Sequence, residues 1–209
     1  MRVTVFGATG RTGREVVACA LAAGMDVTAY FRDPARLGPG AAGADVVTGA
    51  LDDDATLREA LDGRDAAVIA LGVGRPLRSD PAVVEGVRRI VAAMEAAGVP
   101  RLVYLSFAGV GEGRRRAGPV IRHVLARVVR NEAADHARKE AIVRASALDW
   151  TIVRPPLLTG GPARGGLRAG EDVEAAGPLP RVSRADVAAE LVAQITATDH
   201  IRRAPSLMP

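Results

Sequence analysis

Hydrophobic and polar positions divide the chain into two kinds of segment. Short runs rich in Val, Ile and Ala predict buried strands, and longer runs with apolar residues three or four positions apart predict helices. The predicted strands cover residues 2–6, 26–31, 45–48, 66–71, 101–106 and 149–153. The predicted helices cover residues 11–23, 54–61, 80–97, 119–145 (continuous or broken) and 183–196. Strands that alternate with helices indicate a parallel sheet with crossover helices.

Several predicted helices carry residues typical of helix ends. Asp80 and Pro81 suit the start of one helix, and Gly98 suits its end. Ser183 and Asp186 have the spacing of a capping box at the start of the last helix. Residues 159–170 are rich in Gly, Pro and Arg, which predicts a mobile loop.

The first predicted strand ends in a glycine-rich turn with glycines at positions 7, 10 and 13. Gly7 permits a tight exit from the strand, Gly10 lets the backbone approach a phosphate, and Gly13 lets the helix pack close to the sheet. The following helix N-terminus offers free N–H donors and a partial positive charge. The turn predicts dinucleotide binding by a Rossmann-type, doubly wound parallel sheet with helices on both faces. The alternative is a turn of purely structural glycines.

The end of the second predicted strand indicates which dinucleotide is bound. A site for NAD needs a carboxylate there to accept a hydrogen bond from the ribose 2′-hydroxyl. Here Arg32 follows the strand, Arg36 comes shortly after, and Asp33 suits a cap of the next turn. Two guanidinium groups match a 2′-phosphate, so NADPH is the predicted cofactor. The alternative is a pair of solvated arginines in a chain where all but one of the 28 Lys and Arg residues are Arg.

Other catalytic arrangements find no support in the sequence. A Tyr-x-x-x-Lys proton-transfer pair is missing, because neither Tyr30 nor Tyr104 stands four residues before Lys139, the one lysine. A G-x-S-x-G nucleophile motif is also missing. Metal catalysis is not expected, because the histidines show no ligand spacing: His123, His136 and His200.

Composition narrows the setting. The 209 residues are 48% hydrophobic and 25% charged, which fits one globular domain over residues 1–209. The single cysteine, Cys19, excludes an internal disulfide, suits the buried face of the first helix and indicates a reducing compartment. We expect a cytoplasmic protein without a membrane segment, because the longest apolar run, residues 66–73, is too short to span a bilayer.

The net charge of +4 suits an anionic ligand such as a dinucleotide. Arg114, Arg115 and Arg116 form a basic run, but aromatic residues for base stacking are not interleaved with it. A solvated loop is therefore the preferred interpretation of this run. We expect no specific nucleic-acid partner.

The sequence resembles the atypical short-chain dehydrogenases/reductases, which include flavin reductase/biliverdin-IXβ reductase and the NmrA-like NAD(P)H-binding proteins. The similarity covers nearly the whole chain. It is carried by VFGATGRTG (5–13), FRDPAR (31–36), ALG (70–72), LS (105–106), DH (135–136), DWTIVRPPL (149–157) and SRADVA (183–188).

The resemblance implies a set of cofactor-binding residues. Contacts to the pyrophosphate come from the glycine-rich turn, contacts to the 2′-phosphate from the two arginines, and contacts to the adenine, ribose and carboxamide from the ends of later strands. These residues are Gly7, Thr9, Gly10, Arg11, Thr12, Gly13, Arg32, Arg36, Leu51, Asp52, Leu71, Gly72, Pro155, Pro156 and Leu157. Relatives commonly carry Gly-Asp-Leu near the adenine, where this chain has Gly-Ala-Leu-Asp over residues 49–52, so Asp52 stands in for the missing acid.

The resemblance also implies the chemistry: hydride transfer from NADPH to a small, flat electron acceptor such as a flavin or quinone, with the substrate side built mainly from residues 107–180. Ser106 is the candidate to orient the acceptor or a bound water, and His136 is a candidate proton donor. The alternative for Ser106 is a strand-end hydroxyl that bonds to backbone, and the alternative for His136 is a surface residue of a helix. A non-catalytic NADPH sensor that regulates a protein partner is the competing function. We expect a monomer or homodimer.

Overall fold

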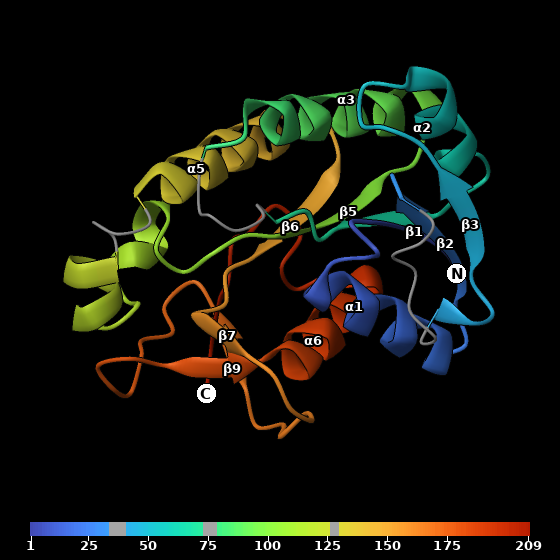
Figure 1. The fold of residues 1–209 in the computed structure, drawn as a ribbon. Helices are drawn as coiled ribbons and strands as arrows, with labels where there is room; N and C mark the ends of the chain where they lie inside the picture. Colours follow the sequence, from blue (N-terminus) through green and yellow to red (C-terminus); the bar gives the residue numbers. More distant parts are fainter. Residues whose placement is uncertain (34–40, 73–78, 126–129) are drawn as a thin grey trace.

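Six parallel strands form the central sheet of the computed structural model (Figure 1). Their order across the sheet is β3-β2-β1-β4-β5-β6, the order of a doubly wound Rossmann sheet. From β1 the sheet grows to one side through β2 and β3 and to the other side through β4, β5 and β6, which opens a crevice between β1 and β4 at their carboxyl ends. The strand bounds are β1 Arg2–Phe6, β2 Asp26–Phe31, β3 Asp45–Thr48, β4 Ala66–Ile69, β5 Arg101–Leu105 and β6 Asp149–Val153.

The structure describes residues 1–33, 41–72, 79–125 and 130–209. Arg36, the second predicted contact to a 2′-phosphate, lies outside the described residues. Every other predicted site residue lies within them.

Two helical layers cover the sheet (Figure 1). Helices α1 (Arg11–Ala22) and α6 (Arg184–Thr196) lie on one face, and α2 (Asp54–Leu61), α3 (Pro81–Ala97) and α5 (Arg130–Ala145) lie on the other. The sheet serves both layers because side chains alternate along a strand: Val3 and Val5 pack with the first layer, and Phe6 packs with the second. The predicted fold class is confirmed. No helix in the described ranges has the length and apolar character needed to cross a membrane.

The predicted helix ends are confirmed where the structure describes them. The Asp80 side chain accepts from the backbone N–H of Val83 at the start of α3, and Gly98 ends that helix with φ +68°. The Ser183 hydroxyl accepts from the backbone N–H of Asp186, as a capping box requires. Cys19 is partly buried and packs against the core on the α1 side.

The region after β5 differs most from the prediction. A 3-10 turn (Gly111–Arg115) precedes the predicted helical stretch of residues 119–145, and within that stretch the structure describes a π-helical turn (Ile121–Leu125) and α5 (Arg130–Ala145). Four short strands were not predicted. They pair as β7 (Leu157–Thr159) with β9 (Arg181–Ser183), and β8 (Arg168–Gly170) with β10 (Ser206–Met208). Residues 159–170 therefore end in a paired strand.

Candidate functional site

The glycine-rich turn is held by backbone packing at its two outer glycines. Gly7 has φ +85°, and a Cβ there would lie 2.8 Å from the carbonyl oxygen of Ala70 at the end of β4. A Cβ on Gly13 would lie 2.1 Å from the carbonyl oxygen of Gly7. Both positions therefore exclude any larger side chain. A Cβ on Gly10 would meet the Gly7 oxygen at 3.2 Å, which is much less severe, so the fold alone does not demand glycine there.

The start of α1 differs from the starts of α2, α3 and α6. Asp53, Asp80 and Ser183 cap α2, α3 and α6 with their side chains. Within the described residues no side chain caps α1, whose N-cap is Gly10 and whose first turn carries no acidic residue. This helix start follows β1 at the carboxyl end of the strand. An uncapped helix start that follows a turn with glycines at positions 7, 10 and 13 fits the diphosphate of a dinucleotide.

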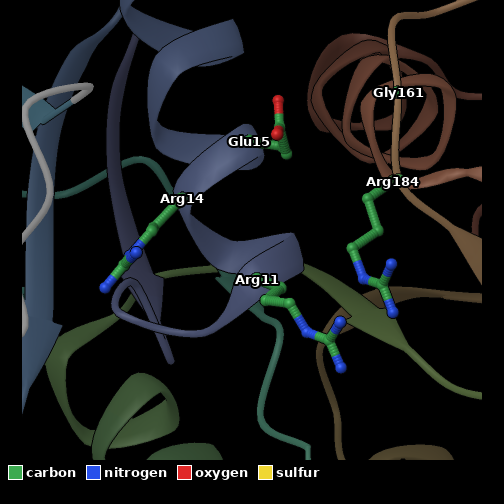
Figure 2. A pocket seen from close by; sticks show the side chains of 6 residues that line it. Arg11, Arg14, Glu15, Gly161 and Arg184 are labelled. Carbon is green, nitrogen blue, oxygen red and sulfur yellow. The ribbon is translucent and has the colours of Figure 1, made fainter.

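A pocket of about 270 Å³ lies beside this helix start (Figure 2). It is bounded by the first turns of α1 and α6 and by the backbone after β7. Its lining is mainly cationic and consists of Arg11, Arg14, Glu15, Gly160, Gly161 and Arg184. Of the predicted pyrophosphate contacts, Arg11 is exposed and Thr12 and Gly13 are buried at the turn.

The predicted 2′-phosphate and adenine contacts lie along the ends of β2 and β3. Arg32 directly follows β2 and is exposed. Leu51 is half-buried and packs against the core on the side of the sheet covered by α2, α3 and α5. Asp52 beside it is exposed. The Tyr30 hydroxyl fixes this turn by donating to the carbonyl of Ala50 at 2.7 Å. Arg32, Leu51 and Asp52 thus follow strands that end at the same edge as the glycine turn.

Leu71 and Gly72 continue the chain beyond β4, next to the glycine turn. The N–H of Ala70 donates to the carbonyl of Phe6 at 2.9 Å and fixes their approach to β1. Leu71 is half-buried, and Gly72 is exposed with no described atom within 4 Å of a built Cβ. That Leu71 and Gly72 line the ribose side of a bound dinucleotide stays a prediction.

Ser106 follows β5 and is buried against α5. Its hydroxyl donates to a carboxylate oxygen of Glu140 at 2.5 Å. Glu140 also forms a two-point ion pair with Arg154, at 2.9 Å to Nε and 2.5 Å to Nη2. The Ser106 proton is therefore engaged with Glu140, and the role of this hydroxyl in orienting an acceptor or a water stays a prediction. The hydroxyl thus donates to a side chain, whereas the alternative interpretation placed its hydrogen bond on the backbone.

His136 lies on α5 and is only 7% exposed, so it is not a surface residue. Its Nδ1 lies 3.2 Å from the hydroxyl of Tyr104 on β5. Burial, and then the charge of Lys139, lower the pKa of His136 to about 3. The ring is neutral near pH 7. A neutral imidazole still carries one N–H, so a role for His136 as proton donor stays a prediction.

The predicted carboxamide contacts follow β6. Pro155 and Pro156 are buried and have no N–H to donate. The carbonyl of Pro155 accepts from the N–H of Ala108 at 2.9 Å, so part of its capacity is used inside the fold. Leu157 is half-buried and begins the pairing of β7 with β9.

Lys139 was not predicted as a site residue, yet it is fully buried on α5. Within the described residues its Nζ has no hydrogen-bond partner. Burial lowers the pKa of Lys139, while Asp135, Glu132 and Asp80 oppose the shift. The available signal was the placement of polar residues at 135, 136, 139 and 140, which share one face of a helix that must pack on the sheet.

Comparison with known proteins agrees with this geometry. A family described as NAD(P)H-binding matches residues 7–198. A reductase from Streptomyces griseus, named (4-alkanoyl-5-oxo-2,5-dihydrofuran-3-yl)methyl phosphate reductase, is 36% identical over 210 residues, which is 97% of this chain. The chain spans 66% of the length of that relative.

Two solved structures share the fold. The anaerobilin reductase ChuY from Escherichia coli O157:H7 has a TM-score of 0.83 at 23% identity, covering 100% of this chain and 97% of ChuY. A short-chain dehydrogenase/reductase from Veillonella parvula, solved in complex with NADP, has a TM-score of 0.79 at 18% identity, covering 100% and 94% of the two chains. The resemblance to atypical short-chain dehydrogenases/reductases is confirmed, and the chain belongs to the NAD(P)H-binding family.

Proposed function

We propose that the chain is an NADPH-dependent reductase that delivers hydride to a small, flat acceptor such as a flavin or quinone. The observation that carries the proposal is the uncapped start of α1 at the carboxyl edge of a 3-2-1-4-5-6 sheet, in a turn where Gly7 and Gly13 leave no room for a Cβ. This arrangement offers backbone donors to a diphosphate and no competing side chain. The relationship to a named reductase supports the same class of reaction.

The chain's own residues bind and orient. The first turn of α1 binds the diphosphate, Arg32 binds the 2′-phosphate, and the residues after β4 and β5 bound the space for the reacting ring. When bound, the nicotinamide supplies the hydride. A flavin or quinone accepts the hydride and takes its proton from solvent, so the site needs no charged proton donor. This agrees with a neutral His136 and an engaged Ser106 hydroxyl. The substrate side is proposed to come mainly from residues 107–180.

The preference for NADPH over NADH rests on Arg32. A guanidinium contact with a phosphate contributes about 1.5–3 kcal/mol, or roughly 10- to 100-fold in affinity. Arg32→Ala is therefore expected to lower the affinity for NADPH and to leave the affinity for NADH nearly unchanged. Fluorescence titration with each cofactor measures both affinities. Equal affinities of the unaltered chain for NADPH and NADH would contradict the assignment.

Turnover tests the reaction. We expect steady loss of NADPH absorbance with at least one of FMN, menadione and dichlorophenolindophenol. An unsaturated lactone belongs in the same panel, because the Streptomyces griseus relative is named for a dihydrofuran substrate. Tight NADPH binding without turnover across this panel would instead favour a non-catalytic sensor.

A further inference from the structure

Two arginines from different helices converge on the pocket beside the glycine turn. Arg11 is the first residue of α1, and Arg184 is the first residue of α6. Figure 2 shows their guanidinium groups pointing toward the same end of the pocket, while Arg14 points away from them and Glu15 lies one turn further along α1. The fold therefore places two positive charges side by side.

Neither charge is neutralised inside the described part of the protein. Over those residues, no hydrogen bond or ion pair joins either guanidinium to another group. Partial burial, and then the charge of Arg11, lower the pKa of Arg184. Two neighbouring guanidinium groups repel each other, and an anion between them would turn this repulsion into attraction.

The wall of the pocket is fixed by one carboxylate. Asp186 accepts from the N–H groups of Arg164 and Gly165, both at 2.8 Å, and its other oxygen accepts from the Ser183 hydroxyl at 2.6 Å. These bonds tie the backbone after β7 to the first turn of α6. The segment carrying Gly161 is thus held beside Arg184, and the Asp186 carboxylate is directed to the loop and the cap.

We propose that the guanidinium groups of Arg11 and Arg184 form an anion subsite that receives a phosphate or carboxylate group of the acceptor, so that Arg11 serves the cofactor diphosphate through its backbone N–H alone. The inference rests on the proposed reductase function and defines its substrate class as anionic. The cofactor diphosphate already has the free N–H groups of α1. Arg184 comes from the opposite wall, which follows β9 and belongs to the part of the chain beyond β6. The guanidinium pair can grip the oxygens of such a group through forked hydrogen bonds.

The test compares two flavins that differ by one phosphate. Protein saturated with NADP⁺ is titrated with FMN and with riboflavin, and flavin fluorescence gives each dissociation constant. FMN is expected to have a dissociation constant lower than that of riboflavin by about tenfold or more. Arg184→Gln is expected to abolish this preference without changing riboflavin binding. Arg181→Gln removes the same charge from an exposed position outside the pocket and should keep the preference.

Two results would overturn the inference. One is equal binding of FMN and riboflavin by the unaltered protein. The other is an Arg184→Gln variant that binds NADP⁺ more weakly but keeps the FMN preference, which would assign the arginine to the cofactor diphosphate.

A second probe needs neither turnover nor a flavin. With NADP⁺ saturating, inorganic phosphate should raise the Tm of the unaltered protein and of Arg181→Gln but not that of Arg184→Gln. This outcome would stand even if no acceptor were reduced, so it separates the subsite from the proposed function. If neither flavin binds, the absence of a phosphate-dependent Tm shift in the unaltered protein overturns the inference.

Discussion

Replacement of Gly13 by alanine inserts a methyl group where the backbone of the turn already lies. The new Cβ would be 2.1 Å from the carbonyl oxygen of Gly7 and 2.8 Å from its carbonyl carbon, so backbone must move by about 1 Å to reach ordinary contact. Overpacking of this kind costs about 1–3 kcal/mol, and rigid backbone favours the upper end. For a domain of this size, about 3 kcal/mol corresponds to a Tm decrease of roughly 6–12 °C.

Gly10→Ala provides the matched comparison. Its Cβ would meet the Gly7 oxygen at 3.2 Å, and φ at Gly10 is −70°, which alanine adopts freely. We expect a stability loss of about 1 kcal/mol or less, the cost of a poorer N-cap. NADPH binding should nevertheless weaken strongly, because the methyl group stands where the diphosphate approaches the uncapped helix.

Urea unfolding and fluorescence titration with NADPH separate these effects. Gly13→Ala should lower the free energy of unfolding, and Gly10→Ala should mainly lower the affinity for NADPH. The reasoning is refuted if Gly13→Ala is as stable as the unaltered protein, or if Gly10→Ala binds NADPH with unaltered affinity.

Three further predictions concern the polar groups around α5. His136 has a pKa of about 3 against an ordinary value of 6.5, so its contribution to stability is present above pH 6.5 and is lost as pH falls toward 3. Between pH 6.5 and 3 the free energy of unfolding of His136→Gln, measured with urea, should therefore fall less than that of the unaltered protein. Partial burial raises the pKa of Glu112, but a backbone hydrogen bond and the hydrogen bond and charge of Arg154 lower it more, to about 2 from 4.5. Its contribution is present above pH 4.5 and is lost toward pH 2, so Glu112→Gln should flatten acid unfolding in that lower window; an unchanged profile would contradict this. Glu140→Gln removes the buried carboxylate partner of Arg154, which keeps its ion pair with Glu112, so the loss should lie near the lower end of about 3–5 kcal/mol, measured by urea unfolding. A loss below about 1 kcal/mol would show that the pair is not coupled to folding.

The fold was largely predictable because its signals are local. The alternation of short apolar runs with amphipathic segments gives strands and helices, and the glycine turn gives the type of sheet. The pairs β7–β9 and β8–β10 were missed because a three-residue strand is too short to show alternation. Their partners also lie far apart in sequence: Leu157 pairs with Arg181, and Gly170 with Ser206.

The candidate site was predictable only in part, for a related reason. The glycine turn is a contiguous motif, but the bonding of Ser106 depends on Glu140, 34 residues away, and that of His136 on Tyr104, 32 residues away. Such partners are set by tertiary packing. The polar face of α5 did carry a signal, because a helix that covers a sheet normally turns apolar residues inward. Buried Lys139 is the clearest departure from that rule.

Calorimetric titration of the purified protein with NADPH tests the central claim most directly, namely that the start of α1 binds a dinucleotide diphosphate and Arg32 its 2′-phosphate. We predict that one NADPH binds per chain and that NADH binds with an affinity lower by roughly tenfold or more. Absence of binding heat, supported by absence of any change in nicotinamide fluorescence, would contradict the account.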